Sequence, residues 1–129
     1  MNPVLLLIAL LICHYLADFC LTMPMMIRAK ADGKNVWPIL LHAAVHALLM
    51  GVCIFLFGVD LETLLLLMGL ELTSHFAIDT FKARITSAIP LLADARRKPY
   101  WIVYGLDQLL HQLVVVAIWF LATYDHPQL

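Results

Sequence analysis

Pairs of potential metal ligands recur four residues apart along the chain. Each pair joins a histidine to an aspartate or to a second histidine, and residues at positions i and i+4 lie on one face of an α-helix, one turn apart. Imidazole and carboxylate groups without thiolates suit zinc, iron and manganese. We therefore predict that every pair contributes to one metal site. The pairs are His14 with Asp18, His42 with His46, His75 with Asp79, and Asp107 with His111.

The number of ligands bears on the number of ions. A four-coordinate zinc ion uses four ligands, and the four pairs offer eight. Two ions with bridging aspartates fit that count better, and some of the eight side chains would instead orient a ligating imidazole. We expect one or two divalent ions, with zinc as the first candidate and iron or manganese as the alternatives.

Two further side chains lie on the same helix face as the third pair. Glu71 precedes His75 by one turn, and Lys82 follows Asp79 by three residues. We expect Glu71 to act as a ligand or as a general base on metal-bound water. Lys82 would meet an anionic substrate, or would simply extend to the membrane surface. Gln108, beside Asp107, is a candidate for orienting a ligand through a hydrogen bond.

The pairs lie inside long apolar stretches. The chain has 129 residues, of which 64% are hydrophobic and 13% charged, and a soluble chain of this length cannot bury so much apolar surface. Each stretch approaches the ~20 residues that a helix needs to cross a bilayer. We predict an all-α, four-transmembrane-helix bundle that forms a single membrane domain over residues 1–129. The predicted spans are residues 3–22, 37–57, 59–81 and 100–124, joined by loops 23–36 and 82–99 on one side.

The basic residues predict the orientation. All eight lie in the connections 23–36 and 82–99, so the positive-inside rule places these loops in the cytoplasm and both termini outside. The first and third spans then run inward with their pairs near the end, and the second and fourth run outward with their pairs early. At ~1.5 Å rise per residue, all four pairs fall in one layer of the cytoplasmic half. Residues 84–98 form either an amphipathic interfacial segment or an ordinary loop.

The chain also contains an internal repeat. The segment from His14 to Phe19 resembles the segment from His75 to Phe81, and each is followed by a span that carries a second pair of ligands. Two helical hairpins of similar pattern predict a pseudo-two-fold axis along the membrane normal. Such a bundle builds a central site between facing helices.

Energetics favour a bound cation. Three aspartates within the spans cost about 8–10 kcal/mol on insertion scales, and a structural zinc site contributes about 10–16 kcal/mol. A metal-free polar network or a proton relay is the alternative.

The motifs resemble those of a family of small bacterial and phage membrane proteins, the domain of unknown function 3307 family. The resemblance rests on His14-x-x-x-Asp18-Phe19, the His42/His46 pair, His75-x-x-x-Asp79-x-x-Lys82 and Asp107-Gln108-x-x-His111, and it covers nearly the whole chain. One departure is the glutamine expected shortly after Phe19, where this chain has Leu21 and Thr22. The resemblance implies an integral protein of the bacterial inner membrane and leaves the activity open. The pattern is also distantly similar to membrane-bound metal-dependent hydrolases.

Three classes of function follow as expectations. The first is a metal-dependent hydrolase that acts on a lipid or lipid-linked substrate from the cytoplasmic leaflet, where the basic residues favour anionic headgroups such as phosphates. A di-iron-type oxidase or hydroxylase would use a similar cluster. The second class is a metal sensor, store or transit protein, and the third is a metal-stapled subunit that recruits a larger membrane partner. We expect membrane lipid as a partner, a homo-oligomer or larger assembly as an option, and no nucleic acid.

Overall fold

The computed structural model describes residues 2–124, which are helical for most of their length and contain no strand. Four helical stretches are long and apolar enough to span a membrane: residues 3–20, α3, α4 and α6. The predicted all-α bundle of four such helices is therefore confirmed. The segments are α1 (Pro3–Tyr15), η1 (Leu16–Cys20), α2 (Pro24–Asp32), α3 (Trp37–Leu56), α4 (Leu61–Ala88), α5 (Pro90–Ala93) and α6 (Lys98–Tyr124).

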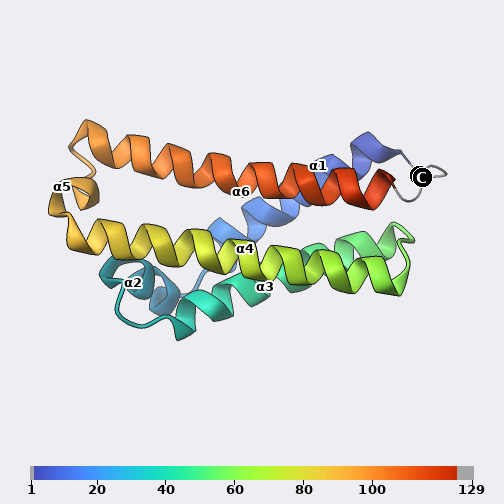
Figure 1. Cartoon of the computed structure of the whole chain (residues 1–129), viewed down its shortest axis with the longest axis horizontal. Helices are drawn as coiled ribbons and strands as arrows, with labels where there is room; N and C mark the ends of the chain where they lie inside the picture. Colours follow the sequence, from blue (N-terminus) through green and yellow to red (C-terminus); the bar gives the residue numbers. More distant parts are fainter. Residues whose placement is uncertain (1, 125–129) are drawn as a thin grey trace.

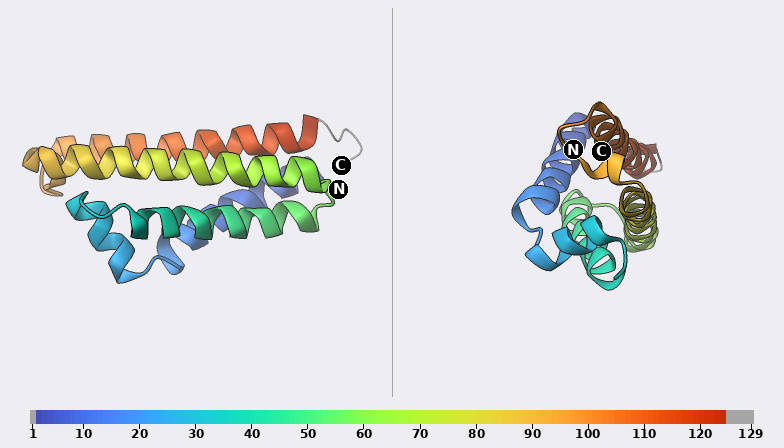
Figure 2. Two further views of the ribbon diagram at one scale, coloured as in Figure 1. Left: turned by 60° about the horizontal axis from the view of Figure 1, so that its bottom comes forward. Right: turned by 90° about the vertical axis from the view of Figure 1, so that its left-hand side faces the viewer.

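The long helices form a ring in which α1 contacts α3 and α6, and α4 contacts α3 and α6. Figures 1 and 2 show α4 and α6 side by side along their length, whereas α1 crosses the bundle obliquely. At its start α1 lies against the end of α6, where the Trp119 indole donates a hydrogen bond to the Pro3 carbonyl at 2.7 Å. From there α1 diverges from α6 towards α2 (Figure 2). At that end of the bundle, residues of η1, α2, α4 and α6 line a pocket.

That end carries α2, α5 and all eight basic residues, and we call it the basic end. Helix α2 was not predicted from the sequence. Pro24 occupies its first turn, where a missing N–H is tolerated, and Gly33 ends it at φ 64°. Met26 and Ala29 are buried because α2 packs against α3 and α4.

The second connection is also more helical than predicted. Helix α4 continues to Ala88, seven residues past the expected end of its span, and the short helix α5 follows. Ala83 stabilises this extension because it is buried against Ala29 and Ile39. Arg96 then donates hydrogen bonds to Asp94 from its side chain and its backbone, which lowers the pKa of that carboxyl.

The interior changes character halfway along the bundle. Towards the end opposite the basic end, the core is wholly apolar and includes Leu10, Met50, Leu67 and Val115. One turn further along the same face of each helix, the buried residue becomes titratable. Because the same step occurs on all four helices, the polar residues form a single layer. They are His14 on α1, His46 on α3, Glu71 on α4 and His111 on α6.

The two halves of the bundle differ at the basic end. Helix α4 runs without interruption past its His75 and Asp79, whereas α1 gives way at Leu16 to the π-helical turn η1, which contains Asp18. The Leu21 amide closes this wider turn by donating to the Leu16 carbonyl at 2.9 Å. π-Helical turns are rare in proteins overall, and those that occur are often found at functional sites.

Candidate metal centre

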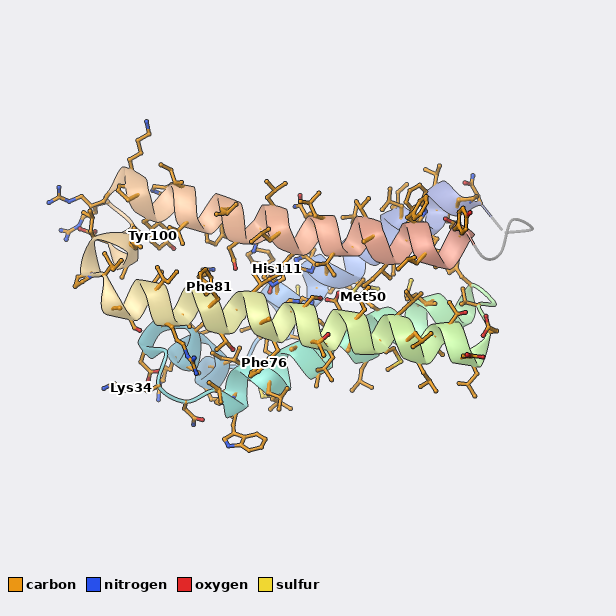
Figure 3. The ribbon with its side chains drawn as sticks, in the orientation of Figure 1. Lys34, Met50, Phe76, Phe81, Tyr100 and His111 are labelled. Atoms are coloured by element: carbon orange, nitrogen blue, oxygen red, sulfur yellow. The ribbon has the colours of Figure 1, made fainter. Side chains whose placement is uncertain are left out.

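Five buried imidazole rings meet at the centre of the bundle. His75 of α4 lies in the middle, with its ring centroid 3.7 Å from that of His46 and 4.2 Å from that of His111. The His14 ring lies 4.9 Å from that of His46, and the His42 ring lies 4.6 Å from it. The labelled His111 points into the bundle in Figure 3. All five are at most 5% exposed, so their nitrogen atoms are shielded from solvent.

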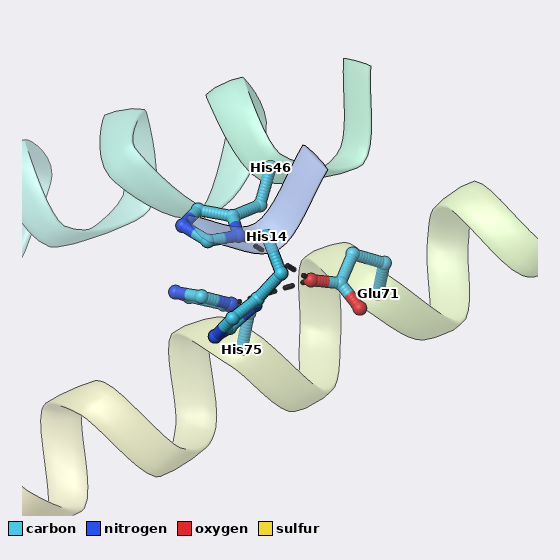
Figure 4. A group of neighbouring side chains, drawn as sticks. All are labelled: His14, His46, Glu71 and His75. Atoms are coloured by element: carbon cyan, nitrogen blue, oxygen red, sulfur yellow. Dashed lines mark hydrogen bonds and ion pairs between the residues drawn. The ribbon is translucent and has the colours of Figure 1, made fainter. Parts of the chain in front are cut away.

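Carboxylates lie between these rings. On α4, Glu71 Oε1 is 3.3 Å from His75 Nδ1, and Asp79 Oδ2 is 3.4 Å from His75 Nε2. Figure 4 shows the Glu71 carboxylate facing both His75 and His46, whose Nδ1 is 3.8 Å away. From η1, Asp18 Oδ1 lies 3.1 Å from His42 Nε2 and 3.4 Å from His46 Nε2.

Three groups of these side chains have the spacing of metal ligands. In each group, one ligand atom per residue lies within 4.8 Å of all the others. His75 belongs to all three. The groups are His14 with His46, Glu71 and His75; Asp18 with His42, His46 and His75; and His75 with Asp79 and His111.

The groups can serve two ions without sharing a residue. His75, Asp79 and His111 would hold one ion, and Asp18, His42 and His46 would hold a second. Each set then supplies three protein ligands. Catalytic zinc sites have three protein ligands and leave the fourth position open to water or substrate.

Buried nitrogen atoms without hydrogen-bond partners support this fit. Both ring nitrogens of His14 and of His46 make no hydrogen bond, nor does Nε2 of His75 or of His111, although carboxylate oxygens lie within 4.0 Å of each Nε2. In His111, Nδ1 lies 2.8 Å from the Asp107 backbone carbonyl, to which it donates. That bond selects the tautomer whose Nε2 carries a lone pair, which is the form that binds metal. Buried polar atoms are normally paired, so the residues present fit divalent ions.

Lys30 of α2 is part of the site, and the sequence analysis did not select it. Its ammonium Nζ lies 2.7 Å from Asp79 Oδ2 and 3.8 Å from Asp18 Oδ1. The sequence around residue 30 does not indicate that Lys30 belongs to the site, because its partners Asp18 and Asp79 come from η1 and α4. The signal that could have marked it is a lysine in the last turn of a helix that packs back against the bundle.

Asp107 and Lys82 pair with each other. Lys82 Nζ lies 2.6 Å from Asp107 Oδ2 and 5.2 Å from the centre of the Tyr104 ring. The Asp107 carboxylate belongs to none of the three groups above. Of the eight predicted ligands, the structure thus brings seven together, and Asp107 lies at the edge beside Lys82. Gln108 donates from Nε2 to Asp18 Oδ2 at 3.3 Å, as an orienting residue would.

The charges of the site do not balance. Asp18, Glu71, Asp79 and Asp107 are four carboxylates, of which three are at most 5% exposed, and Lys30 and Lys82 supply two ammonium groups. The carboxylates therefore outnumber the ammonium groups by two. Uncompensated carboxylates are costly at membrane depth, and bound divalent cations would offset them.

A polar pocket of about 430 Å³ leads to this cluster from the basic end. It occupies the space where α1 and η1 diverge from α6, and η1, α2, α4, α5 and α6 all contribute to its walls. Among the residues of the ligand groups, Asp18 lines the pocket, whereas Glu71, Asp79 and the five histidines do not. Its polar walls include Asp18, Lys30, Lys82, Tyr104, Asp107 and Gln108.

A family model matches residues 6–128, and it describes a protein of unknown function, DUF3307. The chain belongs to the DUF3307 family. No match was found among curated proteins, and none among solved structures. The buried cluster and the polar pocket are therefore the physical basis for inferring what this member of the family does.

Proposed function

We propose that this integral membrane protein is a metal-dependent hydrolase that acts on a lipid or lipid-linked substrate. The observation that carries the proposal is Asp18, which belongs to a candidate ligand group and also lines the polar pocket. A purely structural metal site is normally closed by four protein ligands. Here the His75, Asp79 and His111 group has three ligands, and Asp18 of another group faces a pocket at the basic end.

In this proposal His75, Asp79 and His111 hold one cation, and Asp18, His42 and His46 hold a second. A bound divalent cation supplies Lewis acidity to a water molecule and to the bond that is cut. Zinc is the first candidate, and the imidazole and carboxylate donors also suit iron and manganese. Glu71, which does not line the pocket, takes the role of a ligand or an orienting group for His75 and His46.

Asp107 is the carboxylate that we assign to proton transfer. It lines the pocket, it lies outside the three ligand groups, and its Oδ1 is 3.7 Å from His111 Nδ1. Lys82 Nζ pairs with it at 2.6 Å and holds it in place. Asp107 therefore replaces Glu71 as the candidate general base.

The test uses protein in lipid nanodiscs, stripped of metal and reloaded with zinc, manganese or iron. Elemental analysis measures the bound ions, and mass spectrometry measures cleavage of a panel of membrane lipids and lipid-linked phosphates. We expect metal-dependent cleavage that Asp107→Asn abolishes while the bound metal remains. Glu71→Gln should instead lower the metal affinity. Protein that binds no divalent ion in any of the three loadings would end the proposal.

A non-catalytic metal staple is the second candidate, because the three ligand groups together join all four long helices. It predicts that metal removal lowers the unfolding temperature and that Asp107→Asn has no functional effect. Transit of ions is disfavoured, because the half of the bundle beyond the cluster has a continuous apolar core.

A further inference from the structure

Two ammonium groups face the polar pocket from different helices. Lys30 comes from α2 and Lys82 from α4, and their side chains are 23% and 26% exposed. Each makes one short ion pair, with Asp79 at 2.7 Å and with Asp107 at 2.6 Å. An ammonium group has three N–H donors, so both lysines retain donors for a ligand in the pocket.

The charge balance determines when an anion can bind there. Without metal, four carboxylates face two ammonium groups, which disfavours an anion. Two divalent cations would add four positive charges and would favour a phosphate group. Binding of the cations and of the anion should therefore be coupled, and the coupling is reciprocal.

An apolar groove begins at the same lysine. It has a volume of about 480 Å³, runs between α4 and α6, and shares Lys82 and Asp107 with the polar pocket. Its other walls are apolar side chains, among them Ile78, Phe81, Val103 and Leu106. A molecule that places an anionic group on Lys82 can therefore lay a hydrocarbon chain along this groove.

We propose that the pocket and the groove together bind one phosphate-bearing lipid, with Lys30 and Lys82 holding the phosphate and the groove holding a chain. This deepens the proposed function, on which it rests for the metal-bound state. The lipid is a better occupant than free phosphate, since the groove would give no added affinity to an inorganic anion. Binding requires the cations, because without them the carboxylates outnumber the ammonium groups.

The experiment measures lipid binding by native mass spectrometry, with the full chain in detergent micelles, with and without manganese. The probes are dioleoyl phosphatidate, dioleoylglycerol with the same chains and no phosphate, and inorganic phosphate as a competitor. We expect metal-loaded protein to prefer phosphatidate over dioleoylglycerol by at least about tenfold, as expected for charge-assisted hydrogen bonds. Metal-free protein should show no such preference.

Variants assign the effect to the two lysines. Lys30→Met and Lys82→Met should each weaken phosphatidate binding by about tenfold, and Lys34→Met is the matched control. Lys34 is exposed and lies outside the pocket at the same end of the molecule (Figure 3). Since Lys82→Met leaves Asp107 without its partner, the double variant Lys82→Met/Asp107→Asn removes both charges together. Lys82→Arg keeps the charge and should keep binding.

Three results would overturn the inference: equal binding with and without manganese, equal binding by the Lys30, Lys82 and Lys34 variants, or inorganic phosphate that binds as tightly as phosphatidate. Its failure is distinguishable from failure of the hydrolase proposal. Metal-dependent phosphatidate binding without cleavage of any lipid supports the inference and rejects the hydrolase. If the protein cleaves a phosphate-free lipid, and the Lys30 and Lys82 variants cleave it equally well, the hydrolase proposal is supported and the inference is rejected.

Discussion

His75→Ala should sharply weaken metal binding at the proposed His75, Asp79 and His111 site. His75 is the only residue common to all three ligand groups, and its ring lies between those of His46 and His111. A structural zinc site contributes about 10–16 kcal/mol through four ligands. One ligand is then worth about 2.5–4 kcal/mol, so the zinc affinity should fall by about 10²–10³-fold.

Asp107→Asn is the matched comparison, because Asp107 lies beside the cluster without joining a ligand group. Isothermal titration of metal-stripped protein with zinc, supported by elemental analysis, gives the affinity and the number of ions. We expect Asp107→Asn to keep the wild-type number of ions. Circular dichroism checks that both variants remain helical. Unchanged zinc binding in His75→Ala, with the fold intact, would refute the assignment of the centre.

Two further substitutions test the supporting structure. Thr22→Val removes a hydroxyl that donates to the Asp18 carbonyl at 2.7 Å and lies 3.5 Å from His42 Nδ1. Because this hydroxyl would orient the ligand His42, zinc affinity should fall by about tenfold with no change in the number of ions. Gly33→Ala places a Cβ 2.7 Å from the Ala83 carbonyl oxygen at φ +64°, which should lower the free energy of unfolding by at least about 1–2 kcal/mol in detergent denaturation.

Matched controls separate these effects from general damage. Thr73→Val alters a threonine on α4 that bonds only to the carbonyls of Gly69 and Leu70, and it should leave zinc affinity unchanged. If it weakens zinc binding as much as Thr22→Val, the hydroxyl of Thr22 has no special role. Gly69→Ala meets no atom within 4 Å and should be tolerated. Equal stability of the Gly33 and Gly69 variants would contradict the close approach of α2 to α4.

The sequence by itself determined the membrane bundle and the layer in which its polar side chains meet. Apolar stretches of sufficient length specify spans, and the i, i+4 spacing puts both members of each pair on one face. Burial of that face follows from the cost of ionisable groups in lipid. The inward direction of His14, His46, His75 and His111 was therefore predictable from periodicity alone.

Only the tertiary structure decided which charged groups pair with which. Lys30 reaches Asp79 because α2 folds back against α3 and α4, and a nine-residue helix in a polar connection gives little periodic signal. Asp107 lies beside Lys82 because α6 packs along the extended α4. The polar pocket exists because α1 diverges from α6 where the π-helical turn begins. Local spacing specifies the face of a helix, but the partner across the bundle depends on how the helices cross.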